Sequence, residues 1–216
     1  MKPSLLIWDW NGTLLDDLDL CNRCLNDLLD AYGYAQRYDA AAYKEIFGFP
    51  IQDYYRRAGF DFTRHPYEAL AEHYMEEYLP AAEGGCGLCP GAHGALEWAR
   101  DAGIRQVILS ASQLPILRRQ VEERSLSGFF DELLGQSDIY ARGKKETGLS
   151  YLKESGIDPA SAVLVGDTLH DFEVASAMGT RCVLCAAGHQ SRARLETAGV
   201  PVIDTLNELP ACLAGL

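Results

Sequence analysis

An apolar segment near the start of the chain reads Leu5-Leu6-Ile7-Trp8-Asp9-Trp10-Asn11-Gly12-Thr13-Leu14-Leu15-Asp16. Its apolar run predicts a buried strand that ends at Asp9, and the Asn11-Gly12 pair predicts a sharp turn directly after it. A carboxylate therefore stands at the carboxyl end of a buried strand, where open α/β sheets bind their ligands. A second cluster follows another apolar run in the same way, Gly166-Asp167-Thr168-Leu169-His170-Asp171. Two acidic clusters at strand ends indicate one site for a divalent metal ion.

The composition is that of a folded chain with an acidic balance. Its 216 residues suffice for one well-buried domain plus a small insert, and 48% of them are hydrophobic. The 19 basic and 31 acidic residues give a formal net charge of -12, which argues against nucleic acid or an anionic membrane as a partner. The sequence contains no apolar run of roughly 18 residues and does not open with a signal-peptide pattern. We therefore expect a cytoplasmic protein.

The pattern of apolar residues divides the chain into two kinds of segment. From about residue 17 to 87 the pattern is helical, in short amphipathic stretches separated by glycine and proline. From Pro90 onward predicted helices alternate with predicted strands, which indicates right-handed βαβ units. We predict an α/β core with a Rossmann-like parallel sheet flanked by helices, made of residues 1–16 and 88–216, and an inserted all-α cap of residues 17–87. Further strands are expected at 105–110, 162–167, 181–185 and 201–203, a short segment at 129–134, and helices at 91–102, 114–126, 144–155, 169–178, 190–198 and the C-terminus.

Chemically useful side chains follow several of these strands. Ser110 ends the strand at 105–110, and Lys144 opens a helix after Ala141-Arg142-Gly143. With Asp9 and Asp167 they would supply a nucleophile, a hydroxyl, a cation and hard oxygen ligands, which are the components of phosphoryl transfer. Each also has a purely structural interpretation. A strand-end Asp or Ser often caps a helix or forms a turn, and a lysine at a helix start often faces solvent.

Taken together and in this order, the motifs resemble the haloacid dehalogenase-like superfamily. The resemblance is closest to its phosphoglycolate-phosphatase-like branch, in which a helical cap follows the first motif. It covers essentially the whole chain and rests on the D-x-N-G-T-L start at Asp9 and the G-D-x-x-x-D pattern from Gly166 to Asp171. It implies a Mg²⁺-dependent enzyme that hydrolyses a small phosphate monoester, with a small phosphorylated metabolite as its partner.

The resemblance also implies a role for individual residues. Asp9 would attack phosphorus and form an aspartyl-phosphate. Asp9, Asp167 and the backbone carbonyl of Asn11 would hold Mg²⁺, with Asp171 bound to the metal directly or one shell further out.

The implied phosphoryl site adds four residues to this set. Lys144 is preferred over its neighbour Lys145 because it directly follows Gly143. The contacts to the phosphoryl group and its loop would come from Thr13, Ser110, Ala111 and Lys144.

Position 11 departs from the family pattern. Members that hydrolyse phosphate esters usually carry a second aspartate there, which protonates the leaving alcohol and then deprotonates the attacking water. Asn11 cannot shuttle a proton near neutral pH, and such acid–base help is worth roughly 10²–10⁴-fold. Three alternatives follow: substrates with good leaving groups such as acyl phosphates, another proton source such as His170 or Asp53, or a catalytically weak phospho-ligand-binding or regulatory protein. Replacing Asn11 by Asp is expected to raise activity on alkyl phosphates.

Two further segments lie where they could reach such a site. In the cap, Phe47-Gly48-Phe49-Pro50 is followed by Arg56 and Arg57, which either meet a substrate carboxylate or face solvent. Near the predicted active-site edge, Gly188-His189-Gln190-Ser191 follows a strand, and helix capping by Ser191 explains that segment almost as well.

Six of the seven cysteines form three C-x-x-C pairs. Cys21/Cys24 and Cys86/Cys89 flank the insert, so they either meet as a four-thiolate zinc site or are incidental thiols. The Cys182/Cys185 pair lies on a predicted strand, where this spacing points the two side chains to opposite faces.

Overall fold

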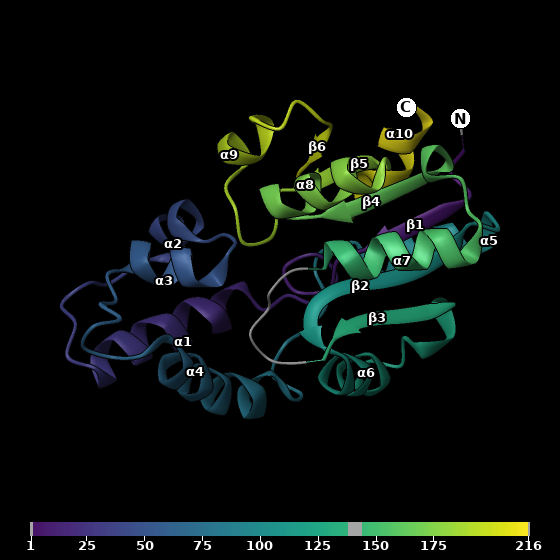
Figure 1. Cartoon of the computed structure of the whole chain (residues 1–216). Helices are drawn as coiled ribbons and strands as arrows, with labels where there is room; N and C mark the ends of the chain where they lie inside the picture. Colours follow the sequence, from purple (N-terminus) through teal and green to yellow (C-terminus); the bar gives the residue numbers. More distant parts are fainter. Residues whose placement is uncertain (1, 138–143, 216) are drawn as a thin grey trace.

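The computed structural model describes residues 2–137 and 144–215. Within them a parallel six-stranded sheet has the order β3-β2-β1-β4-β5-β6 (Figure 1). This confirms the predicted α/β fold with a Rossmann-like sheet. The strands are β1 (Leu5–Trp8), β2 (Arg105–Gln113), β3 (Glu132–Gln136), β4 (Ala162–Gly166), β5 (Arg181–Cys185) and β6 (Val202–Ile203).

Helices cover both faces of the sheet because its strands are apolar on both sides. Leu6 and Trp8 of β1 pack into one hydrophobic cluster, and Leu5 and Ile7 pack into another, as the two-residue period of a strand requires. The first cluster contains side chains of α5 (Ala92–Asp101), α6 (Leu114–Glu123) and α10 (Leu209–Ala214), and the second contains side chains of α7 (Lys145–Ser155), α8 (Leu169–Met178) and α9 (Arg192–Glu196). Short 3-10 turns are η1 (Ser127–Phe129), η2 (Pro159–Ser161) and η3 (Leu206–Glu208).

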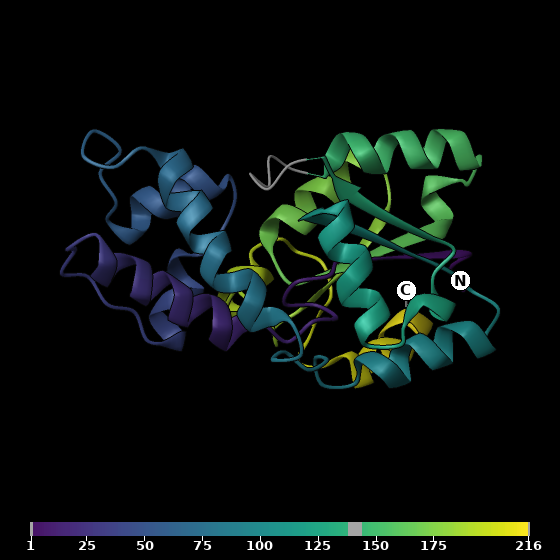
Figure 2. The same cartoon turned by 90° about the horizontal axis from the view of Figure 1, so that it is seen from below.

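Four helices follow β1 and form a separate lobe at one end of the sheet (Figures 1 and 2). Their buried side chains make a hydrophobic cluster of their own, around Leu25, Leu29, Tyr43 and Leu70. The chain enters and leaves this lobe side by side, because Leu15 and Leu88 form an antiparallel bridge. We keep 17–87 as our proposal for the cap and 1–16 with 88–216 as our proposal for the core. The helices are α1 (Leu18–Ala31), α2 (Ala40–Ile46), α3 (Ile51–Ala58) and α4 (Tyr67–Ala82).

Some element ends differ from the prediction. Strand β2 continues past Ser110 to Gln113, because a register shift against β3 lets Gln113 pair with Gln136. Helix α6 ends at Glu123, and the left-handed backbone of Ser125 (φ 56°) prevents its continuation. In α9, the first helical residue is Arg192.

The residues just before α9 are held by contacts that a helix does not provide. The Gln190 side chain accepts a hydrogen bond from the Leu169 backbone N–H and donates one to the Phe47 carbonyl.

The two cysteines of β5 face opposite sides of the sheet, as predicted: Cys182 packs in one cluster and Cys185 in the other. None of the helices in the described residues is long and apolar enough to cross a membrane.

Candidate active site

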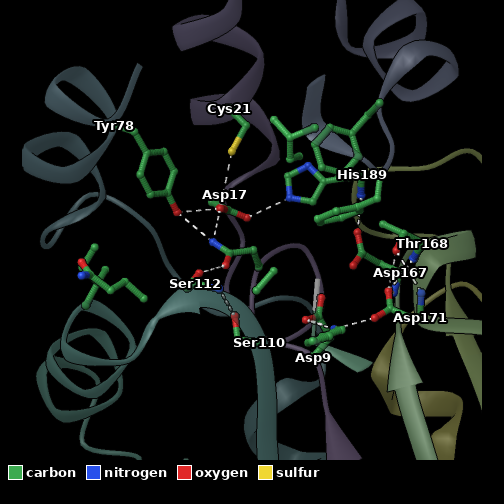
Figure 3. A pocket seen from close by; sticks show the side chains of 18 of the residues that line it. Asp9, Asp17, Cys21, Tyr78, Ser110, Ser112, Asp167, Thr168, Asp171 and His189 are labelled. Carbon is green, nitrogen blue, oxygen red and sulfur yellow. Dashed lines mark hydrogen bonds and ion pairs between the residues drawn. The ribbon is translucent and has the colours of Figure 1, made fainter. Parts of the chain in front are cut away.

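Three carboxylates meet at the carboxyl ends of the central strands. Asp9 follows β1, Asp167 follows the adjacent strand β4, and Asp171 lies in the first turn of α8 (Figure 3). All three are buried, and each offers an oxygen within 4.8 Å of the others. Since β1 and β4 are neighbours in a parallel sheet, their ends bring together residues that are far apart in the sequence. The structure therefore brings the acidic residues of the two predicted clusters together.

Lys144 lies against this cluster. Its Nζ contacts Asp9 Oδ1 and lies 2.6 Å from Asp171 Oδ1, and its side chain is 3% exposed. Lys145 is 52% exposed and pairs with Glu146 at 3.3 Å. Lys144 is therefore the lysine that faces the site, one residue before α7 begins. Residues 141–143, which the sequence analysis placed just before it, lie outside the described residues.

Burial and the neighbouring charges shift the pKa values of the three carboxyl groups in different directions. Burial raises the pKa of Asp9 well above its usual range, against the opposing effect of Lys144. It also raises the pKa of Asp167 to about 6. At Asp171 the charge and hydrogen bond of Lys144 outweigh burial, and the pKa is lowered. A divalent cation fits this set, because it would offset the charge of several buried carboxylates and Mg²⁺ prefers such hard oxygen ligands.

Asp171 combines this position with a structural role. Its Oδ2 accepts hydrogen bonds from Thr168 Oγ1 at 2.7 Å and from two backbone N–H groups, so it closes a capping box at the start of α8. Its Oδ1 faces Lys144. The helix-capping interpretation considered for Asp9 and Asp167 applies to neither of them, because the capping box of α8 is formed by Thr168 and Asp171.

The turn after β1 holds Asp167 in place. Thr13 Oγ1 donates a hydrogen bond to Asp167 Oδ1 at 3.0 Å. Gly12 has a φ of +71°, and a Cβ there would lie 2.4 Å from Asp167 Oδ2 and from the ring of His189. Only glycine combines this backbone conformation with so close an approach. Thr13 thus supports the site by contact with a proposed metal ligand.

Ser110 and Ala111 line the same pocket as the carboxylates. The Ser110 side chain is buried, and its hydroxyl accepts a hydrogen bond from the Ser112 backbone N–H at 3.0 Å. This contact lies within β2, so Ser110 does not cap a helix.

Asn11 lies in the pocket with its side chain fully hydrogen-bonded. Its Nδ2 donates to Asp17 Oδ2 at 2.7 Å and to the Tyr78 hydroxyl at 2.9 Å. Its Oδ1 accepts a hydrogen bond from Ser112 Oγ at 2.7 Å. Figure 3 labels the three partners of Asn11, of which Tyr78 lies on α4 and Ser112 lies near the end of β2. Asn11 therefore links the four-helix lobe to the end of β2 through hydrogen bonds.

Sequence reasoning missed a buried ion pair beside Asn11. Asp17 Oδ1 lies 3.2 Å from His189 Nε2, and neither side chain is more than 3% exposed. Burial lowers the pKa of His189, but Asp17 outweighs it and brings the pKa to about 9. The pKa of Asp17 is lowered despite burial, chiefly by His189. Two features of the sequence could have indicated this ion pair: the second acid of the Asp16-Asp17 doublet, and a histidine at the predicted active-site edge.

His189 also joins the four-helix lobe to the acidic cluster. Its backbone N–H donates to Asp167 Oδ2 at 2.6 Å, and its Nδ1 is hydrogen-bonded to the Tyr43 hydroxyl at 3.1 Å. Ser191, which the sequence analysis considered as a helix cap, occupies that position but its side chain makes no capping hydrogen bond.

Several of the other candidate residues do not line the pocket. Asp53 pairs with Arg56 on an exposed part of α3, and Arg57 donates to the Ile46 carbonyl at 2.8 Å, so the solvent-facing interpretation of the arginines holds. His170 does not line the pocket and stacks on Phe49, with ring centroids 4.5 Å apart.

The four-cysteine zinc site is not formed. In the described part of the chain, two clusters hold three potential metal ligands each, and the one with a cysteine joins Cys21 to Asp17 and His189. The thiols of Cys24, Cys86 and Cys89 belong to neither.

Comparison with known proteins identifies the family of this chain. The model for haloacid dehalogenase-like hydrolases matches residues 6–185. The chain belongs to the haloacid dehalogenase-like hydrolase family. The predicted resemblance is thereby confirmed, and with it the prediction of a hydrolytic enzyme.

Individual proteins show how far the similarity extends. Phosphoglycolate phosphatase 1 of Pseudomonas aeruginosa is 26% identical over 218 residues, which cover 97% of this chain and 79% of that protein. A predicted phosphatase from Clostridium acetobutylicum has the same fold, with a TM-score of 0.84, 18% identity and 100% of both chains covered. A mutant of CbbY from Rhodobacter sphaeroides, solved in complex with xylulose-(1,5)-bisphosphate, has a TM-score of 0.73 and 25% identity, with 98% of this chain and 99% of that chain covered.

Proposed function

We propose that the chain is a Mg²⁺-dependent phosphatase that hydrolyses a small phosphate monoester through an aspartyl-phosphate on Asp9. The observation that carries this proposal is the buried cluster of Asp9, Asp167 and Asp171 with Lys144. The names of relatives, phosphoglycolate phosphatase among them, support the same reaction class. The xylulose-bisphosphate complex of CbbY supports a small phosphorylated substrate.

The metal would be held by Asp9, Asp167 and the backbone carbonyl of Asn11, with Asp171 close by. When bound, Mg²⁺ supplies positive charge to the phosphoryl oxygens. Lys144 contributes a fixed cation that contacts Asp9, and it favours the ionised form that a nucleophile needs. Ser110 and the backbone near Ala111 would bind the remaining phosphoryl oxygens.

In the reaction, an Asp9 oxygen forms a bond to phosphorus while the bond from phosphorus to the ester oxygen breaks. The leaving oxygen departs with the electron pair and takes a proton from water, because Asn11 has none to give. Water then hydrolyses the aspartyl-phosphate, which releases phosphate and restores Asp9.

The alternative is a phospho-ligand-binding protein with little turnover. The observation that favours it is the network that holds Asn11, because this position can neither donate a proton to a leaving group nor accept one from water.

Hydrolysis of acetyl phosphate separates the two functions. Its leaving group needs no protonation, so turnover should depend on Mg²⁺ and should disappear in Asp9→Asn. The matched control is Asp53→Asn, which removes an exposed carboxylate outside the pocket and should retain activity. If wild type and Asp9→Asn release phosphate equally slowly while Mg²⁺ and phosphate still raise the melting temperature, the protein is a binder.

A further inference from the structure

The pocket that contains the three carboxylates also has an apolar wall. This wall is formed by cap side chains and by one side chain of α6, all of them half-buried: Phe47, Phe49, Ile51, Tyr74, Met75 and Ile116. A substrate whose phosphoryl group lies at Asp9 would place its leaving group against this wall. Apolar and aromatic surface favours an apolar leaving group, since contact removes both surfaces from water.

The cationic side chains that the described residues contribute to the pocket are already paired with carboxylates. Among the described lining residues the cationic side chains are Lys144 and His189. Lys144 is paired with Asp9 and Asp171, and His189 is paired with Asp17. Against the described lining, a carboxylate or second phosphate on the substrate would therefore lose its hydration without gaining an ion pair.

Position 11 limits the leaving group independently. Because Asn11 offers no proton, the ester oxygen must leave as an anion. A phenol ionises at a pKa of about 10, as tyrosine does, whereas an oxygen as basic as that of water has a pKa of about 15.7. An aryl oxide is consequently a far better leaving group here than an alkoxide.

We propose that the substrate is an aryl phosphate monoester without a second charged group, with its ring seated against Phe47, Phe49 and Met75. This inference rests on the proposed phosphatase function and names its substrate class. The Asp9–phosphorus bond forms, the aryl oxygen–phosphorus bond breaks, and the phenoxide takes a proton from water. The apolar wall contacts the ring. Because the pKa of a phenol is low, its oxygen can leave without a general acid.

Four substrates, assayed with the Mg²⁺-loaded protein, test the two parts of this proposal, namely the apolar contact and the leaving group. Phenyl phosphate has an apolar group and a good leaving group, and benzyl phosphate has an apolar group and a poor one. Acetyl phosphate is small with a good leaving group, and 2-phosphoglycolate is anionic with a poor one. We expect kcat for phenyl phosphate to exceed that for benzyl phosphate by about 100-fold or more, the range of a missing general acid. We expect KM to be lower for phenyl phosphate than for acetyl phosphate, and kcat/KM to be lowest for 2-phosphoglycolate.

Failure of this inference differs from failure of the proposed function. If acetyl phosphate is hydrolysed with dependence on Mg²⁺ and Asp9, but 2-phosphoglycolate or benzyl phosphate equals phenyl phosphate, only the substrate class is wrong. If none of the four is hydrolysed, the phosphatase function fails as well.

A charge introduced on the wall tests its role directly. Met75→Lys should lower the ratio of kcat/KM for phenyl phosphate to that for 2-phosphoglycolate by about tenfold or more, as expected when one ion pair is gained and an apolar contact is lost. Leu149→Lys adds the same charge at an exposed position outside the pocket and should leave this ratio unchanged. Equal ratios in wild type and Met75→Lys would show that the wall does not contact the leaving group.

Discussion

The side-chain amide of Asn11 donates a hydrogen bond to the carboxylate of Asp17, with 2.7 Å between Nδ2 and Oδ2. The same carboxylate accepts hydrogen bonds from the Tyr78 hydroxyl and the Gly12 backbone N–H, and it pairs with His189. An amide suits position 11 because a carboxylate there would face that of Asp17 at hydrogen-bond distance. The departure from the family pattern at position 11 is thus linked to the acid at position 17.

This relationship changes the expected effect of Asn11→Asp. The single substitution places two carboxylates in contact, so we expect it to lower the free energy of unfolding by about 1–3 kcal/mol rather than simply to activate the enzyme. The double variant Asn11→Asp with Asp17→Asn restores a donor–acceptor pair and should raise kcat for benzyl phosphate at least about tenfold. Urea unfolding and steady-state kinetics of both variants provide the measurement. A single variant as stable as wild type would show that Asp17 does not constrain position 11.

Lys144 should be required for activity, and its neighbour should not. Lys144→Met leaves Asp9 and Asp171 without their common partner, so we expect a loss of about 10²-fold or more in kcat/KM. Breaking a buried pair also costs about 3–5 kcal/mol of stability in the metal-free protein. Lys145→Met removes an exposed charge and is the matched control. Similar losses in the two variants would refute the assignment.

Mg²⁺ should stabilise the fold through the acidic cluster. At a concentration of about 100 times the Kd, a ligand that binds the folded state adds about 2.7 kcal/mol, which raises the melting temperature by several degrees. Asp167→Asn removes one proposed ligand and should abolish most of this shift, whereas Asp53→Asn should retain it. Thermal unfolding with Mg²⁺ and with EDTA gives the comparison. A shift that survives in Asp167→Asn would place the metal elsewhere.

The ion pair between Asp17 and His189 should give the stability a defined pH dependence. The pKa of His189 in the folded protein is about 9, above its ordinary value of 6.5, so the folded state binds this proton more tightly than the unfolded state. The stabilisation is complete below pH 6.5 and is lost as the pH rises through about 9. The gap in melting temperature between wild type and His189→Gln should therefore narrow between pH 6.5 and 9.5. Tyr43→Phe, which keeps the imidazole, should follow the wild-type pH profile.

Local patterns in the sequence determined the architecture and the acidic half of the site. The apolar run before Asp9 and the one before Asp167 predict strands, and parallel strands end at the same edge of a sheet. The sequence therefore predicted that these acids would meet, and the structure has them within one cluster. This reasoning works because strand periodicity and chain direction are properties of short segments.

Only the tertiary structure decided which other side chains surround that cluster. The sequence favoured Lys144 over Lys145 only by its position after Gly143, whereas packing distinguishes the two directly, because it buries the first and exposes the second. Asp17 and His189 are 172 positions apart and meet because the cap entry and the loop after β5 close over the same strand ends. Such contacts depend on how separate elements pack, which no local pattern encodes. For the same reason the sequence indicated only that Asn11 replaces a catalytic acid, whereas in the fold Asn11 is the hydrogen-bond partner of Asp17.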